Sequence, residues 1–243
     1  MENYVPVKLP SGCKVYEDVD PAGISIRSLK GRDEKLIAEM TSVAADKKLN
    51  AVLKNVLKGM APEELTLGDR KFVLLWLIIN SYGPEYYEHV VCESCFQRSQ
   101  LKFDLSVMES RDLDEKFVQP HEIKLSDGKI VKVRLQTAKD DMKVADYEKK
   151  SGSSWIYRYA LTLVEEGRSV ADKINFLEDL PVGDLAKIRA FHEEFDHGPT
   201  MLAPYTCPQC EFESEVMLPF RLEMFFKYGA SLKRFVNSSV RVD

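Results

Sequence analysis

The fold of this chain is decided by two short stretches, Val90-Val91-Cys92-Glu93-Ser94-Cys95 and Tyr205-Thr206-Cys207-Pro208-Gln209-Cys210. In each, a β-prone run leads into a Cys-x-x-Cys pair, and an alternating run follows a few residues later, at Ser99–Phe103 and Ser214–Leu218. A turn between two strands points both thiolates of such a pair the same way, as in a zinc knuckle. The two pairs together supply four thiolates, which is the full set of a closed tetrahedral zinc site.

We therefore predict a structural Zn²⁺ site with the ligands Cys92, Cys95, Cys207 and Cys210. A closed four-thiolate site leaves no coordination position for water, so its zinc organises the fold and performs no chemistry. A long segment separates the two pairs, and one shared ion would staple distant parts of the chain together. The sequence leaves open whether the pairs share one ion or each binds its own ion with other ligands.

Other uses of these cysteines fit the sequence less well. A thioredoxin-type redox pair lies where a strand meets a helix N-terminus, whereas each pair here is followed by a second strand pattern. Disulfides within the pairs would close strained loops, and the chain begins without a secretory signal pattern. Cys13 lies in a Pro/Gly-containing segment without partner spacing and is interpreted as a free thiol.

The composition bounds the class of protein. Of the 243 residues, 44% are hydrophobic and 30% are charged, which is typical of a soluble globular protein. The net charge of −5 argues against general nucleic-acid binding, which needs a basic face. The longest apolar run, Phe72–Ile79, is far shorter than the roughly 20 residues that span a bilayer. We expect no membrane-spanning segment and an origin in a reducing cytoplasm, where thiolates stay available for zinc.

The first part of the chain predicts an extended arm followed by helices. Residues 1–23 are punctuated by proline and glycine, and Ile24–Leu29 reads as a short strand. Apolar residues at helical spacing predict helices from Gly31 onward, with Leu36, Ile37, Met40 and Val43 on one face, and over Asp46–Lys58, with Gly59 as the stop. A third helix, Arg70–Asn80 with Asp69 as its N-cap, is apolar nearly all round and should be buried.

The second part predicts one hairpin and a run of helices. Glu122–Leu125 and Ile130–Leu135 flank an Asp-Gly turn at Ser126–Lys129. The helical period then returns, and the expected helices are Ala138–Lys149, Ser154–Glu166, Val170–Glu178, Pro181–Phe195 and, after the second knuckle, Pro219–Lys227. The knuckle is thus an internal repeat with a helical insertion between its two copies.

These elements predict an α+β fold in which helical subdomains are joined by a small β element with two zinc-knuckle Cys-x-x-Cys hairpins. The expected divisions are an N-terminal arm and helical unit at 1–83, the first knuckle and hairpin at 84–136, a helical insertion at 137–199, and the second knuckle, closing helix and tail at 200–243.

No catalytic pattern in the sequence outweighs its structural interpretation. His192 and His197 flank two glutamates, but their i, i+5 spacing turns the second histidine away from the face that a zincin helix needs. No Gly-x-Ser-x-Gly, P-loop or dinucleotide fingerprint occurs. Acidic runs such as Glu109–Glu115 fit solvated surfaces, and the aromatic residues fit a core or an interface. We expect a non-enzymatic protein without a small-molecule substrate.

Four segments, read in order, carry a resemblance. They are Leu9–Gly12 with Ile24–Gly31, then Glu64–Arg70, then Ser81–Tyr86, then the first Cys-x-x-Cys knuckle with its trailing β run. In this ensemble, over roughly residues 5–136, the chain resembles the T4-type bacteriophage baseplate hub proteins, which are hub subunits and hub assembly factors.

The resemblance implies a non-enzymatic structural protein of the central hub of a contractile tail, with other phage baseplate and hub proteins as partners. It implies synthesis in the host cytoplasm and a final place in the virion tail baseplate. The alternative is a hub assembly chaperone of the same family that is absent from the mature virion. A zinc-dependent enzyme using His192 and Glu193 and a nucleic-acid-binding zinc module are the competing classes, and the histidine spacing and the acidic charge argue against them.

Overall fold

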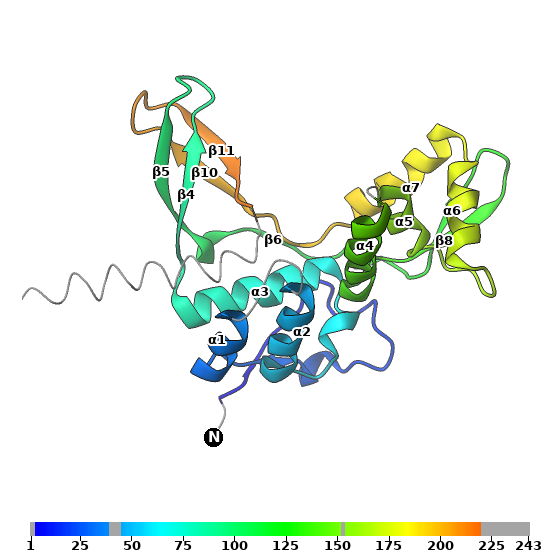
Figure 1. Ribbon diagram of the computed structural model, residues 1–243, viewed down its shortest axis with the longest axis horizontal. Coiled ribbons are helices and arrows are strands. Elements are labelled where there is room, and N and C mark those ends of the chain that lie inside the picture. Colours follow the sequence, from blue (N-terminus) through cyan, green and yellow to red (C-terminus); the bar gives the residue numbers. More distant parts are fainter. Residues whose placement is uncertain (1–2, 39–44, 152–153, 220–243) are drawn as a thin grey trace, which may run out of the picture.

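The computed structural model describes residues 3–38, 45–151 and 154–219. Figure 1 shows an N-terminal group of helices, a second helical group at its upper right, and a module of paired strands that projects from the N-terminal group at the upper left. One hydrophobic core joins the N-terminal helices to the projecting strands, and a separate core lies inside the second helical group. The predicted α+β class is confirmed.

The N-terminal group packs helices on a small sheet. Strands β1 (Val5–Pro6), β2 (Ser25–Ile26) and β3 (Leu57–Lys58) form an antiparallel sheet in that order. Helices α1 (Gly31–Ala38) and α2 (Ala45–Val56) lie between β2 and β3 in the chain, with the short 3-10 helices η1 (Pro21–Gly23) and η2 (Pro62–Glu64) nearby. The expected helical spacing is present in α2, whose Leu49, Val52, Leu53 and Val56 are all buried.

Two boundaries in this group differ from the prediction. The second helix ends at Val56 and not at Lys58, because Leu57 and Lys58 pair with Ile26 and Ser25. Met40 and Val43, which the helical spacing places on the face of the first helix, lie outside the described residues.

Helix α3 (Leu67–Tyr82) is the buried centre of the N-terminal group, as its nearly continuous apolar sequence predicts. The predicted cap was wrong, because Thr66 is the N-cap and its hydroxyl accepts a hydrogen bond from the backbone N–H of Asp69 at 3.2 Å. Asp69 lies inside the first turn, where its carboxylate has other partners. Gly83 caps the C-terminus of the helix. Its φ of +99° is readily adopted by glycine and is strained for other residues.

The carboxylate of Asp69 fastens the start of α3 to the N-terminal arm. It accepts hydrogen bonds from the Ser11 backbone N–H at 2.9 Å and from the Tyr16 hydroxyl at 2.5 Å. Burial, followed by the charge of Asp69, raises the pKa of Tyr16, so the phenol keeps the proton that it donates. The buried His197 closes the network, with its Nε2 at 2.7 Å from the Thr66 hydroxyl.

The backbone of α3 also touches the strand that leads to the second knuckle. Strand β9 (Gly198–Pro199) pairs with β6 (Ser110–Arg111) and runs against the N-terminus of α3. A Cβ on Gly68 would lie 2.3 Å from the His197 carbonyl oxygen, and one on Gly198 would lie 2.4 Å from the Gly68 carbonyl oxygen. Glycine at both positions therefore permits the approach.

We expect Gly68→Ala to destabilise the protein strongly, because backbone cannot move away as a flexible side chain can. The cost should be about 2 kcal/mol or more in the free energy of unfolding, measured by urea denaturation. Gly183→Ala is the matched control: Gly183 has the same position in its helix, and a Cβ there meets nothing within 4 Å. The control should leave stability unchanged or slightly raised. Equal losses in the two variants would contradict the close approach.

The second helical group packs against a hairpin. Strands β7 (His121–Lys124) and β8 (Ile130–Val133) confirm the Asp-Gly hairpin, and α4 (Ala138–Ser151), α5 (Trp155–Ala160), α6 (Val170–Glu178) and α7 (Val182–Glu194) follow. The helix expected over Ser154–Glu166 is much shorter, because Leu163 forms an antiparallel bridge with Val133. The closing helix expected at Pro219–Lys227 falls almost wholly outside the described residues.

The projecting module consists of two hairpins packed face to face. Strands β4 (Glu85–Val91) and β5 (Arg98–Asp104) form the first, which is followed by the 3-10 helix η3 (Leu105–Val107). Strands β10 (Leu202–Thr206) and β11 (Glu213–Met217) form the second. The buried side chains of the two hairpins belong to one core cluster and include Tyr86, Val90, Phe103, Ala203 and Tyr205.

Candidate metal centre

Each Cys-x-x-Cys pair lies in a six-residue turn at the end of its hairpin. The last strand pairs are Val91 with Arg98 in the first hairpin and Thr206 with Glu213 in the second. Because the hairpins pack against each other, both turns lie at the tip of the projecting module (Figure 1).

The two turns have the same hydrogen bonds. The N–H of the residue after the second cysteine, Phe96 or Glu211, donates to the carbonyl of the first cysteine at 2.9 Å in both turns. The N–H of Cys92 donates to the Gln97 carbonyl at 3.0 Å, and the N–H of Cys207 donates to the Phe212 carbonyl at 2.9 Å. Such turns hold two neighbouring thiols on one side of the backbone, as the sequence predicts.

Backbone N–H groups also point at the first sulfur of each pair. The N–H of Ser94 lies 3.4 Å from the Cys92 Sγ, and the N–H of Gln209 lies 3.4 Å from the Cys207 Sγ. Donors that face a sulfur favour its thiolate form. The backbone N–H of Cys95 is the largest influence that lowers the pKa of Cys92, to about 7. At Cys95 the Gln97 N–H lowers the pKa, but burial and the three neighbouring sulfurs outweigh it and raise the pKa to about 12, so the close sulfurs do not lose their protons equally easily. Thiolates are the form in which cysteine binds metals.

The structure brings the four sulfur atoms of Cys92, Cys95, Cys207 and Cys210 together. All four lie within 4.8 Å of one another, with Cys92 Sγ 3.7 Å from Cys210 Sγ and Cys95 Sγ 3.7 Å from Cys207 Sγ. A tetrahedron with metal–sulfur bonds of about 2.3 Å has sulfur–sulfur edges of about 3.8 Å. Two of the six edges, at 3.7 Å, match this value, and the others are no longer than 4.8 Å, so the four sulfurs are close enough to share one metal ion. A disulfide would require about 2.05 Å.

The donor set also restricts the metal. Four clustered soft sulfur ligands suit zinc or iron and do not suit the oxygen-seeking magnesium and calcium. Cys92 and Cys207 are buried, Cys95 is half-buried and Cys210 is exposed, so an ion could enter from the tip. Four thiolates this close repel one another, and a dication among them offsets that repulsion. The arrangement can therefore hold a metal ion that joins the two hairpins.

Both turns contain a residue with left-handed backbone that the sequence does not reveal. Phe96 has a φ of +59° and Glu211 a φ of +58°, each directly after the second cysteine of its pair. Non-glycine residues adopt this conformation at a cost of roughly 1 kcal/mol or more. The repeated strain shows that the turn geometry, and not the local sequence preference, fixes these residues.

We expect Glu211→Gly to keep or raise stability and Glu211→Val to lower it by about 1 kcal/mol or more, because glycine adopts positive φ freely and a β-branched residue does not. Glu211 is exposed, so packing changes little in either variant. Thermal unfolding of the metal-loaded protein measures both. A valine variant as stable as the glycine variant would contradict this account of the turn.

The remaining cysteine and the two histidines lie elsewhere. Cys13 is buried in the N-terminal core, where burial raises the pKa of its thiol and leaves it unreactive. His192, on α7, has its Nε2 3.2 Å from the Thr162 hydroxyl, and burial lowers its pKa to about 4. His197 faces Thr66 in the network at the start of α3. The two histidines thus do not share a site, which agrees with the interpretation of their spacing.

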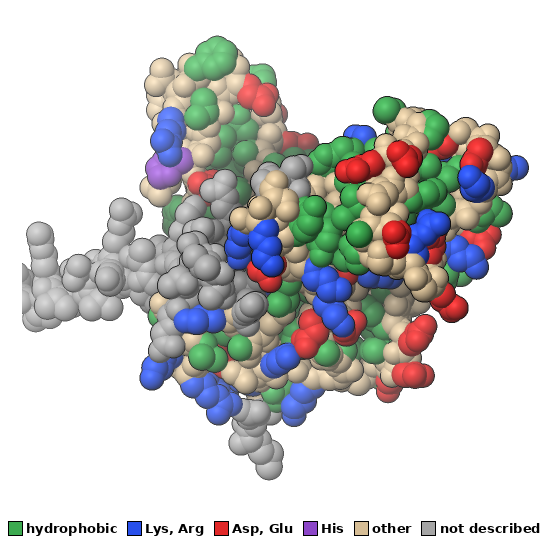
Figure 2. Space-filling view, turned by 45° about the vertical axis from the view of Figure 1, so that its right-hand side comes forward, with side chains coloured by type: hydrophobic (Ala, Val, Ile, Leu, Met, Phe, Trp, Pro, Cys, Tyr) green, Lys and Arg blue, Asp and Glu red, His purple; other side chains and the backbone are tan. Residues whose placement is uncertain are grey.

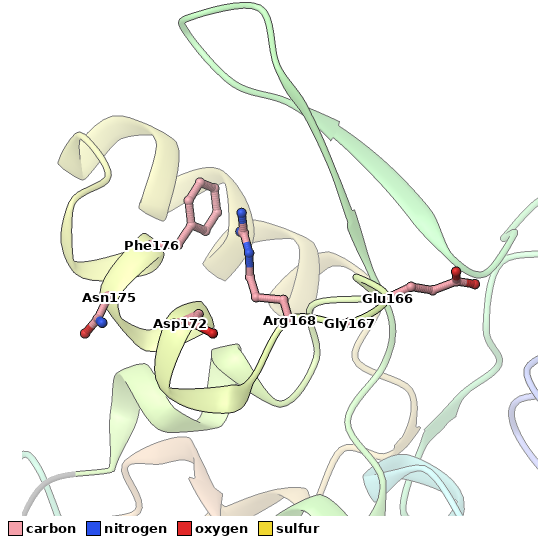
Figure 3. A pocket seen from close by; sticks show the side chains of 6 residues that line it. All are labelled: Glu166, Gly167, Arg168, Asp172, Asn175 and Phe176. Carbon is pink, nitrogen blue, oxygen red and sulfur yellow. The ribbon is translucent and has the colours of Figure 1, made fainter.

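A surface hollow next to α6 has no converging chemistry. It is lined by Glu166, Gly167, Arg168, Asp172, Asn175 and Phe176. Figure 3 shows the Glu166 carboxylate pointing away from the others, while Arg168 lies near the Phe176 ring, with its guanidinium carbon 5.1 Å from the ring centroid. Within the described residues, the four cysteines are the group of His, Cys, Asp and Glu side chains that is arranged to hold a metal.

One face of the molecule shows how charged side chains are distributed over the second helical group. Figure 2 shows Lys and Arg side chains interspersed with Asp and Glu over the second helical group, without a continuous basic area on that face. None of the helices in the described part of the chain combines the length and apolar character needed to cross a bilayer.

Fold and site together define an α+β protein whose two hairpins meet at a cluster of four cysteines. Residues 1–227 match the family model described as T4 bacteriophage base plate protein, so the chain belongs to this family. No curated protein and no solved structure matches the chain. Membership in this family indicates a component of a phage tail baseplate, with a structural role and other phage structural proteins as its partners.

Proposed function

We propose that this protein is a non-enzymatic structural component of the central hub of a contractile-tail baseplate, folded around one structural Zn²⁺ held by Cys92, Cys95, Cys207 and Cys210. The observation that carries the proposal is the convergence of these four sulfurs, all within 4.8 Å of one another and two pairs at 3.7 Å, in a chain of the baseplate family. The hub assignment is supported by the motif order at Leu9–Gly12, Glu64–Arg70 and Ser81–Tyr86.

A structural zinc suits this module because its hairpins are small. Two-stranded hairpins are marginally stable by themselves, and structural zinc sites contribute on the order of 10–16 kcal/mol of apparent binding free energy in zinc-finger peptides. An ion at the tip would hold the hairpins in one relative orientation. A rigid module that projects from the body can present its outer strands to neighbouring baseplate proteins. Synthesis in the reducing host cytoplasm would keep the thiolates available for zinc.

The metal is tested by elemental analysis of protein purified without chelators. We expect about one zinc per chain, because the described residues contain one cluster of four cysteine sulfurs and a structural zinc takes four ligands. Replacement by Co²⁺ should give the visible absorption of a tetrahedral thiolate site. Two ions per chain, or none, would contradict a shared site, and iron in place of zinc would overturn the choice of metal.

The place in the virion is tested on purified tails. Mass spectrometry and cryo-EM should find the protein in the hub at a fixed copy number. Its presence in infected-cell extracts together with its absence from mature tails would overturn the structural assignment and favour a hub assembly chaperone. Density outside the central hub would overturn the hub assignment and leave the metal site unaffected.

A further inference from the structure

The two halves of the chain repeat the same helix-to-knuckle layout. Gly68-Asp69 lies in the first turn of α3, and Gly183-Asp184 lies in the first turn of α7. The interval from Asp69 to Cys92 equals the interval from Asp184 to Cys207, and each helix leads into a Cys-x-x-Cys hairpin. The hairpins begin and end their turns in the same register, at Val91 with Arg98 and at Thr206 with Glu213.

The aspartates in these helices have matching partners. Asp69 accepts a hydrogen bond from the backbone N–H of Ser11 at 2.9 Å, and Asp184 accepts one from the backbone N–H of Ser126 at 3.0 Å. Ser11 and Ser126 are separated by the same interval as Asp69 and Asp184. In both halves a buried carboxylate thus ties the start of the helix to a serine loop before the first helix of that half.

Each half also contains an arginine–aspartate ion pair between its serine loop and its Gly-Asp helix start. Arg27 forms a two-pronged ion pair with Asp33 at 2.7 and 3.3 Å, and Arg134 forms one with Asp140 at 2.6 and 3.0 Å. In both pairs the arginine also donates to the carbonyl of the next residue at 3.0 Å. The aspartate also accepts from the backbone N–H three residues before it, at 2.9 Å from Lys30 and 3.0 Å from Thr137.

The sheets around these arginines correspond as well. In the first half Ile26 pairs with Val5 on one side and Leu57 on the other, and in the second half Val133 pairs with His121 and Leu163. The arginine after the central residue donates its backbone N–H across the sheet at 3.0 Å in both halves, from Arg27 to Val56 and from Arg134 to Thr162. Helix α1 begins four residues after Arg27, and α4 begins four residues after Arg134.

We propose that the chain is a tandem duplication of one unit, covering approximately residues 5–104 and 121–217, and that the metal site is the interface between the two copies. The Cys-x-x-Cys hairpin is then a self-pairing module, and its partner is the second copy of the same hairpin within the chain. The segment 137–199 is no insertion in this scheme. With β7 and β8 it forms the helical body of the second unit, as α1–α3 with β1–β3 form that of the first.

The sulfur contacts have the pattern of a two-fold interface. The first cysteine of one pair approaches the second cysteine of the other, since Cys92 Sγ lies 3.7 Å from Cys210 Sγ, and Cys207 Sγ lies 3.7 Å from Cys95 Sγ. Reciprocal contacts of this kind define an isologous interface, in which one patch meets its own copy. A closed four-ligand site is built in this way from two equal halves, each of which supplies two ligands.

The units differ where the chain connects them. Gly68 is closed in by the His197 carbonyl, whereas its counterpart Gly183 has open space at the same position. The strand that leads into the second hairpin, β9, runs against α3 of the first unit. Helix α6 stands in the second unit where the first has only the short η2. Covalent fusion explains these differences, because each copy can specialise once both are always present together.

The proposal is tested by hydrogen exchange of the intact, metal-loaded protein in low concentrations of denaturant, which resolves cooperative opening units. The strand pair β7–β8 decides the outcome. A duplication requires β7–β8 to open with α4–α7 and separately from α1–α3. The division at 84–136 and 137–199 requires it to open with β4–β5. Opening of β7–β8 with β4–β5, or a common opening of the whole chain, would overturn the duplication.

A second measurement tests the equivalence of the two tips. Residues 92–97 and 207–212 are exchanged reciprocally, which keeps every cysteine in place. The exchanged chain should bind the same number of metal ions per chain as the natural one, because both turns have the same hydrogen bonds. Loss of metal would overturn the equivalence. Both tests concern the isolated protein, so they succeed or fail independently of a place in the hub and of the choice of zinc.

Discussion

Cys207→Ser is expected to abolish tight metal binding and to unfold the projecting module. Cys207 is 1% exposed and its sulfur accepts the Gln209 N–H, so a serine there removes a ligand from the buried side of the site. A structural zinc contributes on the order of 10 kcal/mol in apparent binding free energy, which is comparable to the whole stability of a typical domain, about 5–15 kcal/mol. Elemental analysis and thermal unfolding should both show the loss.

The position of each cysteine predicts a graded series. Cys92→Ser should behave as Cys207→Ser does, because Cys92 is also buried and also faces a backbone N–H. Cys210 is exposed, so water can take its coordination position, as it does in three-ligand zinc sites. Cys210→Ser should therefore weaken metal binding less than the buried substitutions. Equal losses of metal binding after the substitutions at Cys207 and Cys210 would contradict the view that the metal site has a buried side and a solvent-exposed side.

Cys13→Ser provides the control for cysteine chemistry as such. Cys13 is buried outside the cluster, so the variant should keep the metal content of the natural protein and lose at most a modest amount of stability. A chelator should reproduce the effect of Cys207→Ser on the natural protein, and added zinc should reverse it. A Cys207→Ser protein that folds and holds a full equivalent of metal would contradict a four-thiolate site.

The parts of the fold that follow from local sequence were predictable. The Asp-Gly turn fixed the β7–β8 hairpin, and the bounds of α6 agree with the helical period and with the Ser169 capping box. The Cys-x-x-Cys turns predicted two hairpins with neighbouring thiols. The need of a structural zinc for four ligands suggested that the two cysteine pairs meet at one point. The distances between the sulfurs were not predictable, because they depend on how two hairpins that are remote in the sequence pack together.

The parts that were missed depend on contacts between remote segments. Leu57 and Leu163 both continue a helical pattern, yet both leave it to pair with the central strand of their sheet. Thr66 and Asp69 are both residue types that cap helices well. The Asp69 carboxylate instead accepts hydrogen bonds from Ser11 and Tyr16, and Thr66 caps the helix. The equal intervals from the Gly-Asp pairs to the cysteines were present in the sequence. These intervals indicate a repeat only together with the matched hydrogen bonds, because matches of two residues are common by chance.

Arg27→Met is expected to have the largest effect of any single substitution in the N-terminal body. The side chains of Arg27 and Asp33 are 2% and 0% exposed, and their closest contact is 2.7 Å. The methionine fills much of the space but leaves the Asp33 carboxylate buried without its counter-charge. Breaking one side of a buried ion pair typically costs about 3–5 kcal/mol. Chemical denaturation at neutral pH should show a loss of that size.

Two comparisons separate the buried charge from simple loss of packing. Arg27→Met combined with Asp33→Leu should recover part of the loss, because no unpaired carboxylate remains. Lys8→Met removes an ion pair with Asp112 whose side chains are 79% and 65% exposed, and it should cost less than about 1 kcal/mol. A double variant less stable than Arg27→Met alone would contradict a dominant role for the stranded charge.

The pH dependence of stability tests whether the Arg27–Asp33 ion pair stabilises the protein through its charge. Burial by itself would raise the pKa of Asp33, but the hydrogen bonds from Arg27 and from the Lys30 N–H outweigh it and hold the pKa below its ordinary value of 3.8. A lowered pKa contributes stability that is present above the unfolded-state value and is lost as the pH falls through the folded-state value.

The natural protein should therefore lose stability in acid more steeply than Arg27→Met, whose carboxylate takes up a proton more readily. The difference between the two proteins should begin to shrink as the pH falls through the folded-state pKa of the variant's buried carboxylate, and it should shrink further below a pH of about 4, where the natural protein loses the contribution of its ion pair. A difference that stays constant from neutral pH into acid would mean that the arginine acts through packing and not through its charge.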